Sequence, residues 1–276
     1  MASSLNIVQP YTKCGSSDVS SNIIVLPSKT YVEELVTRLE EFEVKSRVEG
    51  IDPYFTVTGK YKVIDLTIGS TGIGAPSLAL LVEEYSRLGG RVFVKVGYAT
   101  AIDPRLSIGD IIIASAAVRA DGTSRHYAPI EYPAYASYEL IWYTMDILRT
   151  YSRIYDHEIK YYTAPVLSVD IISNIDEIVQ KWSKTRVAAI DMETSTLYTM
   201  SNLKMLKSLS VLVINSSIPH GIMPGDLERA SERNVQAKKV KERLLEASKL
   251  VAEILVRIRE EYRYQRELEE RSRGHS

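Results

Sequence analysis

The sequence predicts an α/β protein: one domain with a mixed, mostly parallel sheet flanked by helices. Three apolar runs rich in β-branched residues, at residues 63–68, 92–96 and 111–118, lack regular polar alternation, which is typical of strands buried on both faces of a sheet. Between the first two runs, a glycine turn at residues 69–74 leads into apolar residues at helical spacing, and a pair of glycines ends that helix. This order of strand, helix and strand indicates a βαβ unit.

The glycine turn at residues 69–74 (GSTGIG) has two possible roles, anion binding and close packing. It places backbone N–H groups at the start of a helix, with Pro76 nearby, and such a helix terminus is suited to binding an anion. The same glycines would also let the helix and the strand pack closely without any ligand, and a lone motif of this kind is weak. Both interpretations remain open on the glycines alone.

Length, charge and cysteine content narrow the class of protein. The 276 residues carry 34 Lys and Arg against 35 Asp and Glu, so the net charge of −1 gives no case for a nucleic-acid partner. The apolar runs are too short to cross a membrane and the N-terminus lacks signal-peptide features, so we expect a soluble, cytoplasmic protein. Cys14 is the single cysteine, which excludes an internal disulfide. We expect one domain over residues 1–262 and a charged, mobile tail over residues 263–276.

Local signals predict further elements in the first quarter of the chain. Residues 22–26 predict a short buried strand that ends before a helix. Thr30 and Glu33 have the spacing of a capping box and predict the start of that helix. Residues 55–63 predict a β-hairpin with its turn at Gly59-Lys60.

Two amphipathic helices are predicted later in the chain. One covers residues 135–154 and the other begins at Asp226 and runs to Tyr262. The first helix is expected to bury an aromatic and apolar stripe made of Tyr138, Ile141, Trp142, Met145 and Leu148. The second is expected to bury one apolar face along its whole length.

Several motifs carry a family resemblance. They read STGIGAPS, VFVKVGYATAIDP and IGDIIIASAAVRADGTSRHYAPIEYPA, within a match that runs from about Gln9 to Arg259. In this order they resemble the uridine phosphorylase branch of the nucleoside phosphorylase family. The resemblance implies a barrel-like sheet and trimers or hexamers built from dimers that complete each other's sites. It also implies a nucleoside and inorganic phosphate as substrates, with no metal and no organic cofactor.

The acidic segment Asp191, Met192 and Glu193 follows an apolar strand predicted at residues 186–190 and opens a helix. A carboxylate can accept hydrogen bonds from two vicinal hydroxyls, whereas a glutamate in a first helical turn is also a routine partner of the helix dipole. The segment resembles the family's Glu-Met-Glu-Ser, which implies that Glu193 binds the ribose 2′ and 3′ hydroxyls beside Met192. Asp191 and Glu193 are the candidate catalytic acids, and we expect Asp191 to point away from Glu193.

Two residues are expected to serve a neighbouring subunit's site. By resemblance, Tyr11 holds the place of a family histidine that reaches the ribose 5′ end, and its hydroxyl can still hydrogen-bond a sugar. Arg47 matches an arginine that reaches phosphate across the subunit interface. A solvated surface arginine is the alternative interpretation of Arg47.

The phosphate site implied by the resemblance departs from the family pattern. Lys95 and Tyr98 stand where the family has an arginine and a small hydroxyl residue, so Lys95 keeps the charge without the bidentate fork. A shorter turn at residues 28–31 replaces the family's Gly-Asp-Pro-x-Arg loop, and Ser28 and Lys29 are the candidate phosphate ligands there. A plain helix cap explains this turn equally well.

The candidate base pocket comprises Gly97, Ile172 and Ser216. By resemblance, Ile172 replaces an aromatic residue that stacks on the base, and it leaves an apolar wall. The family's uracil-reading Gln-x-Arg pair is replaced by residues 173–177, which contain no arginine. Ser216 stands where purine-specific relatives carry an aspartate. The base therefore stays unassigned.

Three functions remain open on these residues. The favoured one is cleavage of the N-glycosidic bond of a nucleoside with phosphate as acceptor. The second is a hydrolytic nucleosidase, which is consistent with the lost arginines and would use Asp191 or Glu193 as its base. The third is a non-catalytic subunit or binding protein of the same fold, which would assemble with a paralogue.

Overall fold

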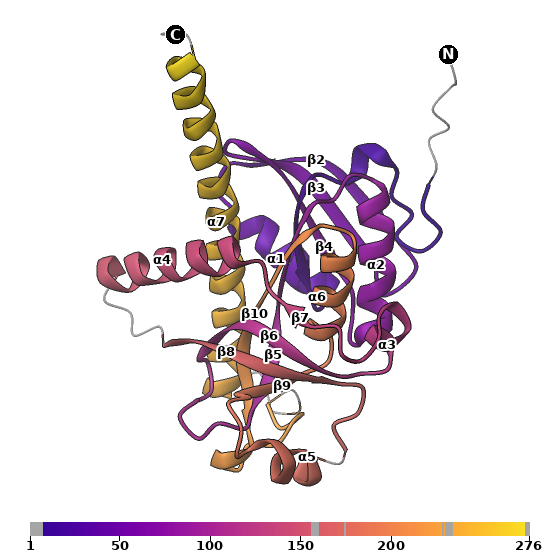
Figure 1. Cartoon of the computed structure of the whole chain (residues 1–276), viewed down its shortest axis with the longest axis vertical. Helices are drawn as coiled ribbons and strands as arrows, with labels where there is room; N and C mark the ends of the chain where they lie inside the picture. Colours follow the sequence, from indigo (N-terminus) through magenta and orange to yellow (C-terminus); the bar gives the residue numbers. More distant parts are fainter. Residues whose placement is uncertain (1–7, 156–159, 174, 228, 230–233, 274–276) are drawn as a thin grey trace.

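The computed structural model of the chain describes residues 8–155, 160–173, 175–227, 229 and 234–273. At its centre, this described part has a ten-stranded mixed sheet with the order β10-β6-β8-β9-β5-β1-β4-β3-β2, and β7 pairs with β6 (Figure 1). Because β10 also pairs with β5, the first five strands of this order close into a barrel, as the resemblance implied. The strands are β1 (Asn22–Leu26), β2 (Phe42–Glu49), β3 (Phe55–Tyr61), β4 (Ile64–Ser70), β5 (Val92–Ala101), β6 (Ile111–Ala120), β7 (Ala134–Tyr135), β8 (Tyr161–Val169), β9 (Ala189–Asp191) and β10 (Lys207–Ser217).

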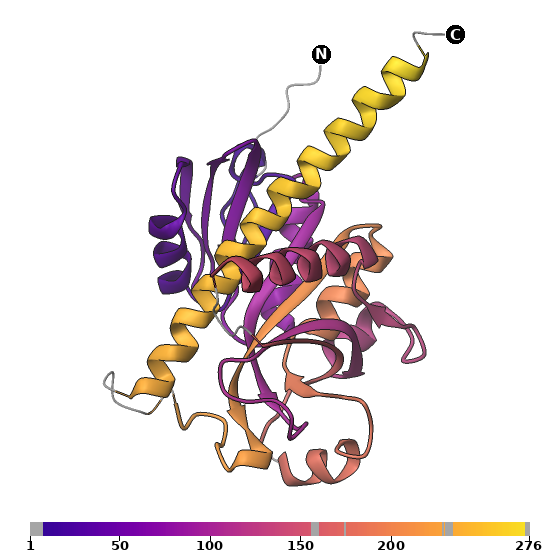
Figure 2. The same ribbon diagram turned by 90° about the vertical axis from the view of Figure 1, so that its left-hand side faces the viewer.

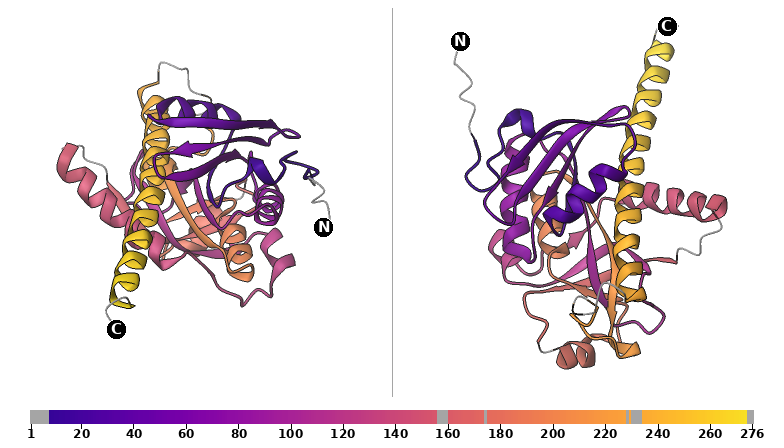
Figure 3. Two further views of the ribbon diagram at one scale, coloured as in Figure 1. Left: turned by 90° about the horizontal axis from the view of Figure 1, so that it is seen from above. Right: turned by 180° about the vertical axis from the view of Figure 1, so that it is seen from behind.

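Helices cover two sides of the sheet. α7 packs against α1, α4 and strands of the sheet on one side, whereas α2, α3 and α6 contact one another on the other side (Figure 3). The helices are α1 (Lys29–Arg38), α2 (Ala75–Arg87), α3 (Thr123–Tyr127), α4 (Tyr138–Tyr155), α5 (Ile175–Trp182), α6 (Thr194–Leu203) and α7 (Val235–Arg273). The apolar core fills the space between the sheet and these helices.

The register of the sheet brings several strand ends to one place. β1 lies between β4 and β5 and is parallel to both, which confirms the predicted βαβ unit and aligns Leu26 with Ser70. Val25 on β1 pairs with Lys95 on β5, and β5 continues beyond Lys95 to Ala101. β9 pairs with this extension of β5 and ends at Asp191. The carboxyl ends of β1, β4 and β9 therefore meet along the second half of β5.

The long helix α7 crosses one side of the molecule and extends past the sheet at its C-terminal end (Figure 2). It begins at Val235 and not at the predicted Asp226, because the Asn234 side chain caps the backbone N–H groups of Gln236 and Ala237. Its apolar face is buried from Val240 to Ile254, but Val235 at its start is 80% exposed, so the expected burial along the whole length was partly wrong. Residues 263–273 continue the helix, and the mobility of this tail stays a prediction. No helix in the described part of the chain combines the length and the apolar character that crossing a membrane requires.

Two local predictions in the N-terminal part were wrong. Lys29 already lies in α1, and Ser28 is its N-cap with no side-chain hydrogen bond, so Thr30 is inside the first turn and forms no capping box. β3 runs through Gly59 without turning, because β2 passes so close that a Cβ on Gly59 would lie 2.3 Å from the carbonyl oxygen of Glu43. The chain turns instead at Lys62, which has a positive φ of 51°.

The predicted inward face of α4 was also partly wrong. Tyr138 and Trp142 are 75% and 50% exposed, whereas Leu140, Thr144 and Leu148 form the buried side. The Thr144 hydroxyl donates to the Leu140 carbonyl oxygen at 2.6 Å, which allows a polar side chain to be buried there. Because apolar residues lie on both sides of this helix, only its contacts with β10 and α7 decide which side is buried.

Candidate active site

A cavity of about 320 Å³ lies where the strand ends meet. β5 forms its central wall, and the turns after β1, β4 and β9 form its sides together with the end of β10. Such crevices at the carboxyl ends of strands are where open α/β sheets bind ligands. The lining residues are Val25, Leu26, Pro27, Thr71, Gly72, Ile73, Lys95, Val96, Gly97, Tyr98, Ala99, Thr100, Ile172, Ile190, Asp191, Met192, Glu193, Asn215, Ser216, Pro224 and Gly225.

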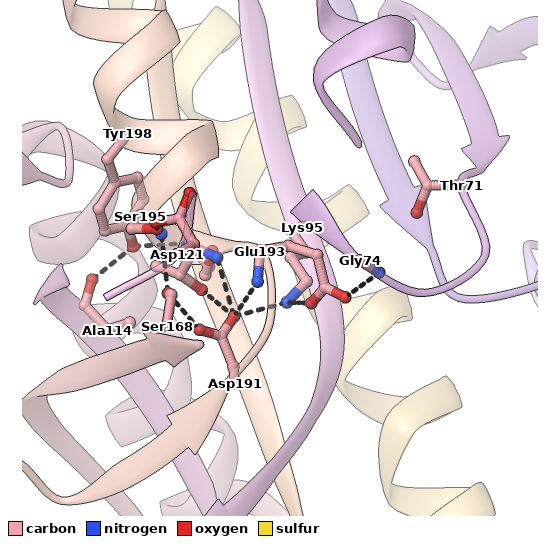
Figure 4. Close-up of polar contacts among 12 residues, drawn as sticks. Thr71, Gly74, Lys95, Ala114, Asp121, Ser168, Asp191, Glu193, Ser195 and Tyr198 are labelled. Carbon is pink, nitrogen blue, oxygen red and sulfur yellow. Dashed lines mark hydrogen bonds and ion pairs between the residues drawn. The ribbon is translucent and has the colours of Figure 1, made fainter. Parts of the chain in front are cut away.

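Glu193 reaches this cavity from the N-cap position of α6 and is 8% exposed. Its Oε1 accepts a hydrogen bond from the backbone N–H of Gly74 at 2.7 Å, and its Oε2 forms an ion pair with Lys95 Nζ at 2.7 Å (Figure 4). Gly74 ends the glycine turn before α2. The anion at this helix start is therefore a carboxylate of the protein itself.

Asp191 also belongs to the cavity lining, but its side chain is fully buried and accepts several hydrogen bonds. Its Oδ1 accepts from the Ser168 hydroxyl at 2.5 Å, and its Oδ2 accepts from Lys95 Nζ at 2.8 Å and from the Thr194 backbone N–H at 2.9 Å. The Thr194 hydroxyl and the Glu193 backbone N–H donate to the same Oδ2. The prediction that Asp191 points away from Glu193 was therefore wrong in one respect, since the ammonium group of Lys95 lies between the two and contacts both carboxylates.

Lys95 is the cation of a buried triad, which we define as Lys95, Asp191 and Glu193. Burial alone would lower the pKa of Lys95, but the charges of Asp191 and Glu193 outweigh it and raise the pKa above its ordinary value. Burial would likewise raise the pKa of Asp191, but the charge of Lys95 and the bonds from Lys95, Ser168 and Thr194 lower it. The triad holds the only ionised side chains among the described lining residues, so the lining carries a net charge of −1.

A second polar contact lies at the β1 side of the cavity. The hydroxyl of Tyr98, which lines the cavity, hydrogen-bonds the hydroxyl of Tyr31 from α1, and the two rings pack edge to face with centroids 6.0 Å apart. Ser28 and Lys29 do not line the cavity. Lys29 instead forms an ion pair with Glu49 on β2, with its ammonium 4.7 Å from the centre of the Phe55 ring.

The cavity lining contains all three residues of the predicted base pocket, Gly97, Ile172 and Ser216. The Ser216 hydroxyl shares a 2.7 Å hydrogen bond with the Thr100 hydroxyl and lies 3.2 Å from Oδ1 of Asn215. Sequence reasoning missed Thr100 and Asn215. Both lie within two residues of a predicted position on the same strand, which is the signal that could have found them.

Tyr11 and Arg47, the two residues predicted to serve a neighbouring subunit, do not line the cavity of their own chain. Tyr11 is 42% exposed, and its backbone N–H and that of Thr12 donate to the buried carboxylate of Glu84 at 3.0 and 2.7 Å. Arg47 is exposed on β2, the edge strand of the sheet. Both are therefore at the surface, where a second chain can reach them.

A buried hydrogen-bond network beyond the triad fixes the start of α6. The Ser195 backbone N–H donates to the Ser168 hydroxyl at 2.9 Å, and the Ser195 hydroxyl donates to Asp121 (Figure 4). Asp121 is fully buried and also accepts from the Thr196 hydroxyl at 2.9 Å. Sequence reasoning missed Asp121, which directly follows β6, because the strand predicted there ended three residues earlier, at Val118. The network holds rigid the turn that carries Glu193.

Comparisons with known proteins agree with this architecture. Residues 22–259 match the model of the phosphorylase superfamily. The chain is 28% identical over 218 residues to a guanosine phosphorylase from Halorubrum lacusprofundi, which covers 79% of this chain and 87% of that protein. It is 37% identical over 169 residues to a uridine phosphorylase from Thermococcus kodakarensis, which covers 58% of this chain and 61% of that protein.

A solved structure of a uridine phosphorylase has the same fold. The crystal structure of uridine phosphorylase from Vibrio fischeri superposes with a TM-score of 0.79 at 29% sequence identity, covering 92% of this chain and 99% of that one. The family match spans most of the chain, and the barrel with its flanking helices is shared. The chain belongs to the phosphorylase superfamily.

Proposed function

We propose that the protein cleaves the N-glycosidic bond of a nucleoside with phosphate as acceptor. The observation that carries the proposal is the Glu193 carboxylate in the cavity, held by Lys95 and by the Gly74 amide. Guanosine phosphorylase and uridine phosphorylase are among the similar proteins, so a nucleoside is the substrate class that family membership supports.

In this proposal Glu193 orients the sugar by accepting hydrogen bonds from its 2′ and 3′ hydroxyls, with Met192 beside it. The C1′–N bond breaks with its electron pair moving to the base, and the sugar passes through an oxocarbenium-like state. The net negative lining favours this developing positive charge. Ile172 provides an apolar wall for the base, and the neutral hydroxyl of Ser216 provides a hydrogen-bonding group at its edge.

Phosphate would be held by groups from two chains. An ammonium has three N–H donors, and the contacts of Lys95 with Asp191 and Glu193 use two of them. The third donor and the Tyr98 side of the cavity form our proposed phosphate subsite, completed by Arg47 of a neighbouring copy. Tyr11 of that copy would approach the ribose 5′ end.

Hydrolysis is the second candidate, favoured by the charge of the lining. A phosphate dianion would enter a cavity whose described lining residues already carry one excess negative charge. Glu193 also occupies the Gly74 amide, a donor that an anion could otherwise use. Water meets neither obstacle, and Glu193 would then be the general base, because the Asp191 carboxylate is already held by Lys95, Ser168 and Thr194.

Release of free base from a panel of nucleosides, with and without phosphate, tests the choice of acceptor. We expect release to depend on phosphate, with the sugar recovered as its 1-phosphate. Equal rates in both conditions, with free sugar as product, would establish the hydrolase instead. Binding without release by the folded protein would identify a non-catalytic subunit, and a search for activity with a paralogue would follow.

Assembly is testable by complementation between two variants. We expect the chain to form a homo-oligomer, a trimer or a hexamer of dimers, in light scattering at micromolar concentration. Arg47→Ala and Glu193→Gln chains should each be weak alone, and mixed oligomers should regain activity, because a hybrid contains sites with both residues intact. Lys45→Ala, on the same strand, is the control and should behave as wild type. A monomer, or no recovery on mixing, would remove Arg47 and Tyr11 from the site.

A further inference from the structure

We infer that Lys95 is a positioning residue that fixes the Glu193 carboxylate for sugar binding, with Asp191 as its anchor. This inference rests on the proposed function, in which Glu193 binds the ribose hydroxyls. It assigns Lys95 a role in addition to the phosphate contact that family resemblance implies, because two of its three N–H donors are used by Asp191 and Glu193. The assignment comes from the contacts of the triad.

The first support is geometric. Lys95 is 7% exposed, and its ammonium lies 2.8 Å from Asp191 Oδ2 and 2.7 Å from Glu193 Oε2. Gly97 leaves room for this conformation, because a Cβ at that position would lie 3.2 Å from Lys95 Cε. The Lys95 side chain therefore lies along β5 over Gly97, and its ammonium reaches the two carboxylates.

The second support is the difference between the two carboxylates. Ser168 and the Thr194 backbone and hydroxyl also hold Asp191, so Asp191 cannot move away from Lys95 without losing several bonds. Within the described part of the chain, the Glu193 carboxylate accepts one further hydrogen bond, from the Gly74 backbone N–H. Asp191 thus anchors the ammonium, and the ammonium in turn holds Glu193.

The third support is the number of acceptor positions. A carboxylate has about four lone-pair positions, two on each oxygen. Lys95 uses one on Oε2 and Gly74 uses one on Oε1, so each oxygen keeps one for a sugar hydroxyl. Two vicinal hydroxyls can therefore bind while both protein contacts stay in place, and the diol replaces only the solvent at Glu193.

The charges of the triad make the inference testable by pH. Among the described residues, the titratable groups that contact the ammonium are Asp191 and Glu193, while Tyr198 from α6 interacts with Asp191 and Tyr98 from β5 lines the same cavity. Burial raises the pKa of Tyr198 above its ordinary range, so it remains neutral. Without the cation, two carboxylates would face each other in a buried place, and their mutual repulsion would favour protonation of one of them.

The test measures the affinity for a nucleoside in the absence of phosphate, by calorimetry at several pH values from about 5 to about 8.5. The nucleoside is one whose base does not titrate in this range. For Lys95→Met we expect affinity at least about tenfold weaker at pH 8, and a further loss on acidification whose midpoint lies at a higher pH than that of the wild type. Lys95→Arg should recover the wild-type midpoint, because it keeps the charge. Lys62→Met, which removes an exposed lysine paired with Glu253, is the control and should change neither quantity.

Other outcomes would overturn the inference. Weaker binding by Lys95→Met with an unmoved midpoint would mean a merely structural role. If Lys95→Met does not fold, the double variant Lys95→Met/Asp191→Asn removes opposite charges together, and it should still bind more weakly than the wild type because Glu193 has lost its ammonium partner. Wild-type behaviour of that variant would also refute the role. Binding unaffected by Glu193→Gln would instead refute the proposed function itself, so the two failures are distinguishable.

Discussion

Replacing Glu193 by glutamine is expected to weaken nucleoside binding about ten- to hundredfold while the melting temperature changes by only about 2–4 °C. A charge-assisted hydrogen bond to a sugar hydroxyl contributes about 1.5–3 kcal/mol, and glutamine keeps the shape of the side chain but has only one acceptor oxygen. The effect on stability is small because the substitution removes the excess charge of the triad. The lost contact with Lys95 is offset by the loss of repulsion from Asp191.

Calorimetry and thermal unfolding of the same preparation measure both effects. Glu253→Gln is a matched control, since Glu253 also pairs with a lysine, Lys62, but lies far from the cavity lining. It should bind nucleoside as the wild type does. Nucleoside binding that survives both Glu193→Gln and Glu193→Ala would mean that the ribose site is not where we place it.

Asp191→Asn is expected to have the largest effect on stability, a loss of about 3 kcal/mol in the free energy of unfolding at pH 7. The Asp191 side chain is fully buried and accepts bonds from Lys95, Ser168 and Thr194. Asparagine would place its NH₂ group where one of the two carboxylate oxygens now accepts hydrogen bonds. The donors that point to that oxygen would then be left unpaired. Glu193 still contacts Lys95 in the variant, which places the effect at the low end of the range for a broken buried ion pair.

The pH dependence of unfolding gives a second reading of the same variant. The pKa of Asp191 is lowered in the folded protein, so its contribution to stability is present above its ordinary value of 3.8 and is lost as the pH falls through the folded value. The raised pKa of Lys95 gives a contribution present below its ordinary value of 10.5 and lost at higher pH. The wild type should therefore keep the triad's contribution between about pH 4 and pH 10.

Urea unfolding at several pH values measures these changes. Asp191→Asn should lose the part of the acid dependence that Asp191 contributes. Asp103→Asn is the control, because Asp103 pairs with the exposed Arg105 at the surface and should contribute less than about 1 kcal/mol. A similarly small effect of Asp191→Asn would show that the buried triad is not a stabilising unit.

Much of the fold follows from local sequence. The central apolar runs became β4, β5 and β6, and the glycine turn became the start of α2, because buried strands and helix starts have signals within a few residues. The inward face of α4 could not be predicted in this way. Its apolar residues surround the helix, and the side that is buried depends on contacts with residues far along the chain.

In the candidate site, too, some features follow from local sequence and others depend on contacts between distant segments. Glu193, Lys95 and Ser216 could be placed near the cavity because each follows or ends an apolar run. The bridge from Lys95 to both carboxylates could not, because it depends on the register of β5 against β9, where Thr100 pairs with Ile190. The ion pair of Lys29 with Glu49 could not be predicted either, because it depends on how α1 packs beside β2.

The most direct test of the account compares a ribonucleoside with its 2′-deoxy analogue in the wild type and in Glu193→Gln, with the four dissociation constants measured by calorimetry without phosphate. If Glu193 accepts from both sugar hydroxyls, the wild type should prefer the ribonucleoside by about tenfold or more, and Glu193→Gln should lose most of that preference. The same preference in both proteins would show that Glu193 does not read the sugar, and would contradict the account.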